Sequence, residues 1–141
     1  MVVVDTSVIL AFMNSTDAHH SAVSTWMAAE TQDLATTPLI VAEADRLVAA
    51  RGGRQALSAL RSDLAAGAYL VDWWPQAMGA AVQVAERYAD MALGLADASL
   101  VVLADRLGTI RIATLDERHF RAVQPLSGAG AFHLLPEDGW A

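Results

Sequence analysis

Four acidic residues stand where apolar neighbours should exclude a carboxylate. Asp5 ends an opening apolar run, Asp97 interrupts a second apolar stretch, and Asp116 follows a third. Glu43 lies inside a further, mainly apolar segment. Burying an unpaired charge costs several kcal/mol or forces a large pKa shift. A divalent cation shared by all four carboxylates is the simplest common explanation, and it favours a metal-dependent enzyme.

Each of these acids also has an ordinary structural explanation. Asp5 and Asp116 could cap a helix or lie in a turn, and Glu43 could be a solvated helix residue. Asp97 is harder to explain in this way, because its neighbours from 93 to 101 leave little polar surface on that turn. The three histidines that could join a metal site, His19, His20 and His119, lack a paired ligand spacing, which favours solvated or structural roles.

The basic residues and the absence of cysteine exclude several other chemistries. All nine basic residues are arginine, so Schiff-base catalysis and a phosphate-binding-loop lysine are absent. The chain also has no cysteine, which removes disulfides, thiol nucleophiles and thiolate metal sites. Oxygen ligands without cysteine or clustered histidine favour Mg²⁺ or Mn²⁺ over Zn²⁺.

Length and hydropathy indicate one folded unit, and we expect a single domain over residues 1–141. The content of hydrophobic residues is 55%, and charged residues interrupt every apolar stretch before the roughly 18 residues that a membrane span needs. The opening Met-Val-Val-Val-Asp has no basic region of the kind that precedes an export signal. We therefore expect a cytoplasmic protein.

A formal net charge of −7 argues against tight nonspecific binding to nucleic acid, which needs a basic surface. It does not exclude a nucleic-acid enzyme, because bound cations can offset an acidic centre and a few arginines can contact phosphates at its rim. The candidates for such contacts are Arg46, Arg51, Arg54, Arg118 and Arg121.

The apolar patterns alternate between strands and helices without hairpin signals. Strands are predicted at 1–4, 34–36, 69–73, 110–113 and 132–135. Helices are predicted at 8–13, from 17 to about 30, from 38 to the glycines at 52 and 53, at 55–66, from 75 to about 91, and at 95–107. This alternation predicts an α/β fold with a small parallel sheet covered by helices on both faces.

In such a fold, ligands bind at the carboxyl ends of the strands. Asp5 and Asp116 follow predicted strands directly, whereas Glu43 and Asp97 lie early in predicted helices. The same edge of the sheet can therefore receive all four acids, although they are far apart in sequence.

Four motifs, in the same order and with similar spacing, resemble those of the PIN-domain ribonucleases, specifically the VapC toxins of bacterial toxin–antitoxin pairs. The resemblance runs from the first strand to about Phe120. The motifs are Val-Val-Val-Asp5-Thr-Ser, Val-Ala-Glu43-Ala-Asp-Arg-Leu, Gly-Leu-Ala-Asp97-Ala-Ser-Leu, and Ile-Ala-Thr114-Leu-Asp116-Glu-Arg-His-Phe.

The resemblance implies a PIN-like three-layer α/β/α fold and an endoribonuclease that acts as a translation-inhibiting toxin. It implies that Asp5, Glu43, Asp97 and Asp116 form the Mg²⁺- or Mn²⁺-binding catalytic site. Thr114 matches the family's hydroxyl residue, and Thr6 and Ser7 could hold the carboxylates with it. The implied partners are an RNA such as tRNA or rRNA, a VapB-type antitoxin, and a second copy of the chain.

Two other classes of function use the same acids. One is a structure-specific DNA nuclease or a phosphatase, although the second aspartate that a phosphatase would have two residues after Asp5 is absent. The other is a non-catalytic module whose acidic cleft captures an Arg-rich peptide.

Overall fold

Five short parallel strands form one sheet in the computed structural model, which describes residues 1–139. The strands are β1 (Val2–Val4), β2 (Leu34–Thr36), β3 (Leu70–Val71), β4 (Arg111–Ala113) and β5 (His133–Leu135). Their order in the sheet is β3-β2-β1-β4-β5, and every neighbouring pair is parallel. The small parallel sheet predicted from the sequence is confirmed.

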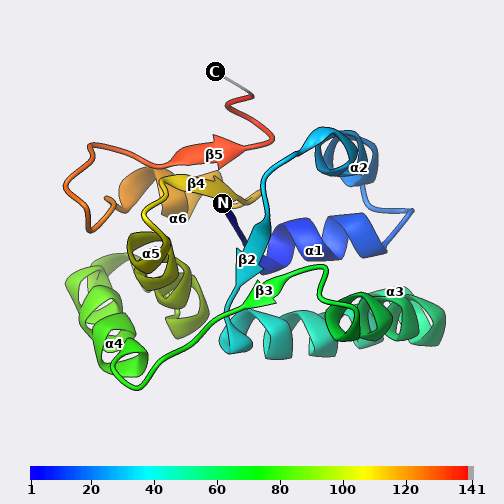
Figure 1. Cartoon of the computed structure of the whole chain (residues 1–141), viewed down its shortest axis with the longest axis horizontal. Helices are drawn as coiled ribbons and strands as arrows, with labels where there is room; N and C mark the ends of the chain where they lie inside the picture. The colour runs from blue at the N-terminus through cyan, green and yellow to red at the C-terminus, as the bar shows by residue number, and fades with distance from the viewer. Residues whose placement is uncertain (140–141) are drawn as a thin grey trace.

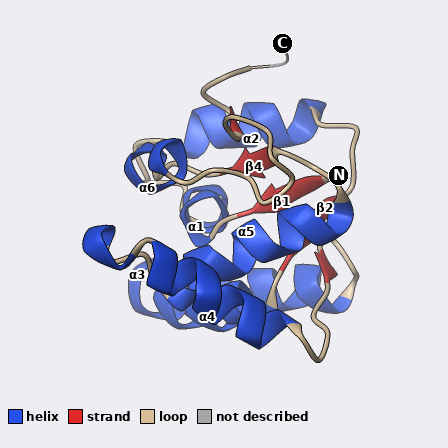
Figure 2. Cartoon of the chain, turned by 90° about the vertical axis from the view of Figure 1, so that its left-hand side faces the viewer, coloured by secondary structure: helices blue, strands red, loops and turns tan. Residues whose placement is uncertain are grey.

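Helices cover both faces of this sheet. The helices are α1 (Thr6–Met13), α2 (His20–Ala29), α3 (Pro38–Ala65), α4 (Ala77–Arg87), α5 (Leu95–Leu107) and α6 (Glu117–Ala122), with a 3₁₀ turn, η1 (Ala89–Met91). Figure 1 shows α1, α2 and α3 on one side of the sheet and α4, α5 and α6 on the other. In Figure 2, α4 and α5 lie in front of the strands. The predicted three-layer α/β/α fold is therefore confirmed.

The central strand is apolar because both of its faces are buried. Val2, Val3 and Val4 of β1 are fully inaccessible to solvent, as expected for β-branched residues between two helical layers. Leu100 and Leu103 of α5 are equally buried. These residues belong to one continuous core, which fixes the carboxyl end of β1 and the start of α5 with respect to each other.

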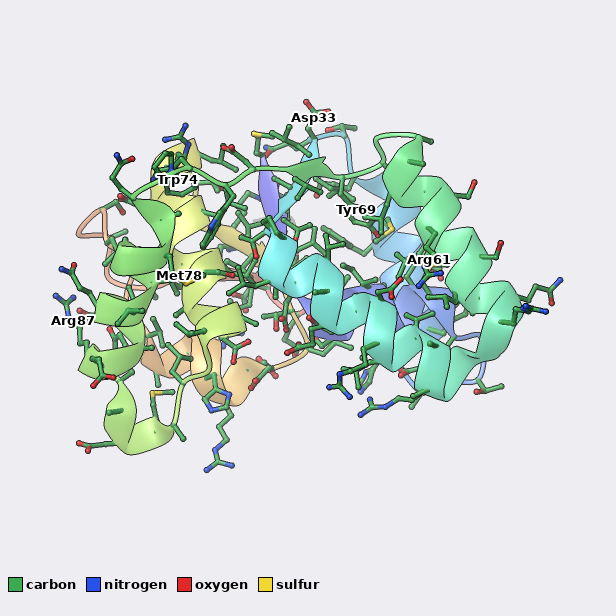
Figure 3. The ribbon with its side chains drawn as sticks, turned by 90° about the horizontal axis from the view of Figure 1, so that it is seen from below. Asp33, Arg61, Tyr69, Trp74, Met78 and Arg87 are labelled. Carbon is green, nitrogen blue, oxygen red and sulfur yellow. The ribbon has the colours of Figure 1, made fainter. Side chains whose placement is uncertain are left out.

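Helix α3 changes direction at Gly53, where φ is +81° and ψ is −176°. A glycine adopts this left-handed backbone without the strain that a side chain would add. The second half of α3 consequently returns beside the first, and Arg61 forms a bidentate ion pair with Asp45 at 2.7 and 2.9 Å. Figure 3 shows Arg61 between the two halves of the helix. The two predicted helices are confirmed as two segments of one bent element.

Three predicted elements differ most from the structure, and the others agree to within two residues at each end. The strand predicted at 69–73 shrinks to Leu70–Val71, which lies at the sheet edge and pairs only with β2. The helix predicted from 75 to about 91 divides into α4 and η1. The helix predicted from Asp17 begins at His20, because the Asp17 carboxylate accepts a hydrogen bond from the His19 N–H and so closes a preceding turn.

The direction of the chain across the sheet reverses between β1 and β4. The connections from β1 to β3 move toward one edge, whereas β4 pairs with the other side of β1 and leads to β5. Ligands of open parallel sheets bind at the carboxyl ends of strands beside such a switch point. Among residues 1–139, no helix has the length and apolar character that spanning a bilayer would require.

Candidate active site

An open pocket of about 350 Å³ lies beyond the carboxyl ends of β1 and β4. The four acids identified in the sequence all line it, although they come from four different parts of the chain. The remaining lining residues are Thr6, Ser7, Leu10, Leu47, Gly94, Leu95 and Ala96. The convergence expected of Asp5, Glu43, Asp97 and Asp116 is therefore present in the structure.

Asp5 is the most buried of these acids, with 4% of its surface exposed. Its backbone N–H donates to the Ala113 carbonyl at 2.9 Å and so extends the pairing of β1 with β4. The hydroxyls of Ser7 and Thr114 both donate to its Oδ2 atom at 2.8 Å. Burial raises the pKa of Asp5 above its ordinary value, and the two hydroxyls and the Thr6 N–H oppose this shift.

The same two hydroxyls connect Asp5 to the loop that carries Asp116. Thr114 Oγ1 accepts a hydrogen bond from the Asp116 N–H at 3.0 Å, and Ser7 Oγ accepts one from the Leu115 N–H at 2.9 Å. Each hydroxyl therefore accepts from the β4–α6 loop and donates to Asp5. This arrangement holds the ends of β1 and β4 in a fixed relation.

Asp116 caps α6 and contacts His119 twice. Its Oδ1 atom accepts from the His119 backbone N–H at 3.2 Å, and its Oδ2 atom lies 2.7 Å from the His119 Nδ1 atom. The hydrogen bond to Asp116 raises the pKa of His119. Sequence reasoning set His119 aside, and the spacing of three residues from Asp116 on a short helix was the signal that could have found it.

Asp97 and Glu43 come from helices rather than strand ends. Asp97 lies in the first turn of α5, and Glu43 lies in the second turn of α3. Burial and the charges of Asp5, Asp116 and Glu43 raise the pKa of Asp97 to about 7, although nearby His119 opposes the shift. Within residues 1–139, neither carboxylate accepts a hydrogen bond from another side chain.

The donor set fits a hard divalent cation. Asp97, Asp116 and His119 can place one ligand atom each within 4.8 Å of the others, and Asp5 and Glu43 line the same pocket. Burial is the largest cause of the raised pKa of Asp97, and the charges of Asp5 and Asp116 add to it, so a bound cation would favour the ionised carboxylate. Carboxylate oxygens are the ligands that Mg²⁺ and Mn²⁺ prefer.

The hydroxyl of Thr6 differs from those of Ser7 and Thr114. Ser7 and Thr114 make the expected hydrogen bonds to Asp5. The corresponding expectation for the Thr6 side chain is wrong, because its buried Oγ1 atom has no hydrogen-bond partner. Thr6 instead acts on Asp5 through its backbone N–H.

Comparison with known proteins identifies the family that shares this architecture and site. The PIN domain family model matches residues 2–124. The chain is 40% identical to Ribonuclease VapC26 of Mycobacterium tuberculosis over 135 residues, which cover 95% of this chain and 99% of that protein. The chain therefore belongs to the PIN-domain family, and within it to the VapC-type ribonucleases.

Two solved structures share the fold. One is Mycobacterium tuberculosis VapC20, described as a Sarcin-Ricin loop cleaving toxin, with a TM-score of 0.74 and 20% identity over 79% of this chain and 87% of that one. The other is FitAcB from Neisseria gonorrhoeae, with a TM-score of 0.59 and 22% identity over 83% and 88% of the two chains. At these identities the likeness supports the fold alone.

Proposed function

We propose that this chain is an Mg²⁺- or Mn²⁺-dependent endoribonuclease that acts as the toxin of a toxin–antitoxin pair. The observation that carries the proposal is the convergence of Asp5, Glu43, Asp97 and Asp116 on one pocket. The 40% identity to Ribonuclease VapC26 over nearly the whole chain supports RNA as the substrate class.

The pocket residues divide the catalytic work as follows. Asp5, Asp97 and Asp116 would hold the cation directly or through water, while Glu43 would either add a ligand or position the attacking water. When bound there, a cation would lower the pKa of that water and stabilise charge on the leaving oxygen of the phosphodiester. Ser7 and Thr114 keep the Asp5 carboxylate in place through their hydrogen bonds.

Exposed arginines supply the phosphate contacts. In the part of the chain that the structure describes, Arg46, Arg51, Arg54 and Arg118 form no ion pair and remain available. Arg121 is less suited to this role than the sequence suggested, because Glu117 and Asp138 already bind its guanidinium. The substrate is a structured RNA such as tRNA or rRNA.

The toxin role implies further partners. A VapB-type antitoxin neutralises the enzyme by covering the acidic pocket, and an arginine of the antitoxin could pair with the same carboxylates. We further propose that residues 1–141 form a single domain and that the protein is a cytoplasmic homodimer.

Cleavage assays on three substrate classes test this proposal. With Mn²⁺, the purified protein should cleave RNA and leave single-stranded DNA and a phosphomonoester such as p-nitrophenyl phosphate intact. Asp97→Asn keeps the side-chain size and removes a charge, so it should lower RNA cleavage at least about 100-fold, beyond the loss typical of residues that only support a metal ligand.

Asp105→Asn is the matched control, because Asp105 lies exposed on the same helix and outside the pocket. Preferential cleavage of DNA or of the phosphomonoester would redirect the proposal to the alternative enzymes. Full RNA cleavage by Asp97→Asn would remove these carboxylates from the mechanism.

A further inference from the structure

His119 engages both oxygens of the Asp116 carboxylate. Its backbone N–H contacts Oδ1 at 3.2 Å, and its ring Nδ1 contacts Oδ2 at 2.7 Å. A carboxylate held at both oxygens by one residue has little freedom to rotate. Each oxygen keeps a further lone-pair direction, so Asp116 can still present an oxygen to the pocket.

The imidazole also connects two elements of the site. The Met91 backbone is near enough to the ring to raise its pKa, and Met91 ends η1, shortly before the first turn of α5 that carries Asp97. His119 itself lies on α6, directly after Asp116. The ring therefore lies between the segments that deliver Asp116 and Asp97 to the pocket.

A carboxylate beside a histidine in a metal site can have either of two meanings. In one, the carboxylate orients the imidazole, which binds the metal through its other nitrogen. In the other, the imidazole orients the carboxylate, which binds the metal. Two observations favour the second meaning here. The pocket is lined by oxygen ligands that suit a hard cation, and Asp116 lines it whereas His119 does not.

We propose that His119 is a positioning residue for RNA cleavage, which orients the Asp116 carboxylate toward the cation without binding the cation itself. This inference rests on the proposed function, because Asp116 is taken as a metal ligand. It gives a role to the histidine of the fourth motif, which the four acids alone do not explain.

Two substitutions separate positioning from a purely structural contribution. His119→Phe keeps a ring but removes both ring nitrogens, whereas His119→Asn keeps an amide donor close to the place of Nδ1. The backbone hydrogen bond from residue 119 to Asp116 survives in both. We expect His119→Phe to lower kcat for RNA about 10–100-fold and to weaken Mn²⁺ binding, as typical for residues that orient metal ligands.

The Michaelis constant for RNA should remain within about twofold of wild type, because no phosphate contact is lost. His119→Asn should restore most of the lost activity and Mn²⁺ affinity. Pulsed electron paramagnetic resonance of the Mn²⁺-loaded wild-type protein should detect no directly coordinated histidine nitrogen. His20→Phe is the matched control, since His20 instead contacts the Ala11 carbonyl at 2.8 Å.

Wild-type kcat and Mn²⁺ affinity in His119→Phe would overturn the inference. An impairment of His119→Asn equal to that of His119→Phe would overturn it too, as would a histidine-nitrogen coupling in the wild type that disappears in His119→Asn. Should His119→Phe fail to fold, His119→Ala carries the same comparison. A wild-type protein that binds Mn²⁺ but cleaves no RNA would instead contradict the proposed function, and the Mn²⁺ affinities of the variants would still decide the role of His119.

Discussion

The acids that follow strands and the acids carried by helices are held in different ways. Asp5 and Asp116 accept hydrogen bonds from Ser7, Thr114 and His119, which fix both carboxylates before any ligand binds. Within the described residues, the Asp97 and Glu43 carboxylates accept no hydrogen bond from another side chain. One half of the pocket is therefore rigid, and the other half faces it with unsatisfied charge.

This difference explains why the largest unfavourable electrostatic effect in the site falls on Asp97. Hydrogen bonds to Asp5 offset part of the effect of burial on its pKa. Asp97 has no such bonds within residues 1–139, and burial together with the charges of Asp5, Asp116 and Glu43 raises its pKa to about 7. The strand ends thus define the position of the site, and the helix-borne acids supply the charge that draws a cation into it.

Removing a support from the rigid half should lower RNA cleavage strongly, although less than removing the charge of Asp97. Thr114→Val keeps the shape of the side chain but deletes the hydroxyl that donates to Asp5 and accepts from the Asp116 N–H. We expect RNA cleavage to fall about 10–100-fold, as for other residues that support metal ligands. Steady-state cleavage with saturating Mn²⁺ measures this loss.

Thr109→Val is the matched control for Thr114→Val. The Thr109 hydroxyl donates to the Met1 carbonyl at 2.9 Å, at the opposite end of β1 from the pocket. The Thr109→Val variant should therefore keep the wild-type activity at saturating Mn²⁺. Equal losses in both variants would mean that hydroxyl removal acts through general stability rather than through Asp5.

The half of the pocket that Asp97 and Glu43 form should make the stability of the metal-free protein depend on pH. Because the pKa of Asp97 is about 7 in the folded protein and 3.8 in the unfolded chain, the folded state binds the extra proton between these values. Stability should therefore decrease as the pH rises from about 4 to about 7 and then level off. The raised pKa of Asp5 acts in the same direction.

Thermal unfolding in EDTA at pH 5 and pH 8 tests this expectation. At pH 8, Asp97→Asn should be more stable than wild type by on the order of 1–2 kcal/mol, since solvent screens part of the repulsion, or by about 3–6 °C in Tm. Mn²⁺ at 100 times its Kd should stabilise the wild type by about 2.7 kcal/mol. The Tm difference between pH 5 and pH 8 should become smaller in metal-free Asp97→Asn. If it stays the same as in the wild type, Asp97 is not the group that makes stability depend on pH.

The positions of Asp5 and Asp116 could be predicted from the sequence better than the contacts between distant elements around the site. Asp5 and Asp116 follow apolar runs that end at the sheet edge, so a local pattern was sufficient to place them. Asp97 was identified because a carboxylate is improbable among its apolar neighbours. Glu43 depended on the order and spacing of the motifs, because its own surroundings allow a solvated residue.

The features that the sequence did not reveal depend on contacts between distant elements. The unpartnered Thr6 hydroxyl and the contact of the His119 ring with Met91 arise only when α1, α6 and η1 are packed. The short β3 has the same origin: an edge position with one partner leaves few ladder hydrogen bonds to extend it. Periodicity along the chain carries no information about such packing.

The smallest predicted effect concerns α3, the helix that carries Glu43. Glu43, Leu47 and Arg51 are spaced four residues apart and so lie on one face of the helix. Leu10 lines the acidic pocket and also an adjoining cavity that is bordered by Arg51 and Asp17. An RNA strand leaving the catalytic centre along this face would meet the exposed Arg51 guanidinium, which forms no ion pair among residues 1–139.

Arg51→Gln should therefore raise the Michaelis constant for RNA a few-fold, leave kcat unchanged, and reduce the salt dependence of binding by about one phosphate contact. The effect should be small, because the carboxylate of Asp17 beside Arg51 already weakens the local attraction for phosphate. Arg87→Gln removes an exposed arginine that Figure 3 places at the far end of α4, so it should change neither quantity. Fluorescence anisotropy with labelled RNA at several salt concentrations distinguishes the two variants. Equal behaviour of both would place the RNA path away from α3, and a fall in kcat alone would mean that Arg51 acts on the carboxylates rather than on the substrate.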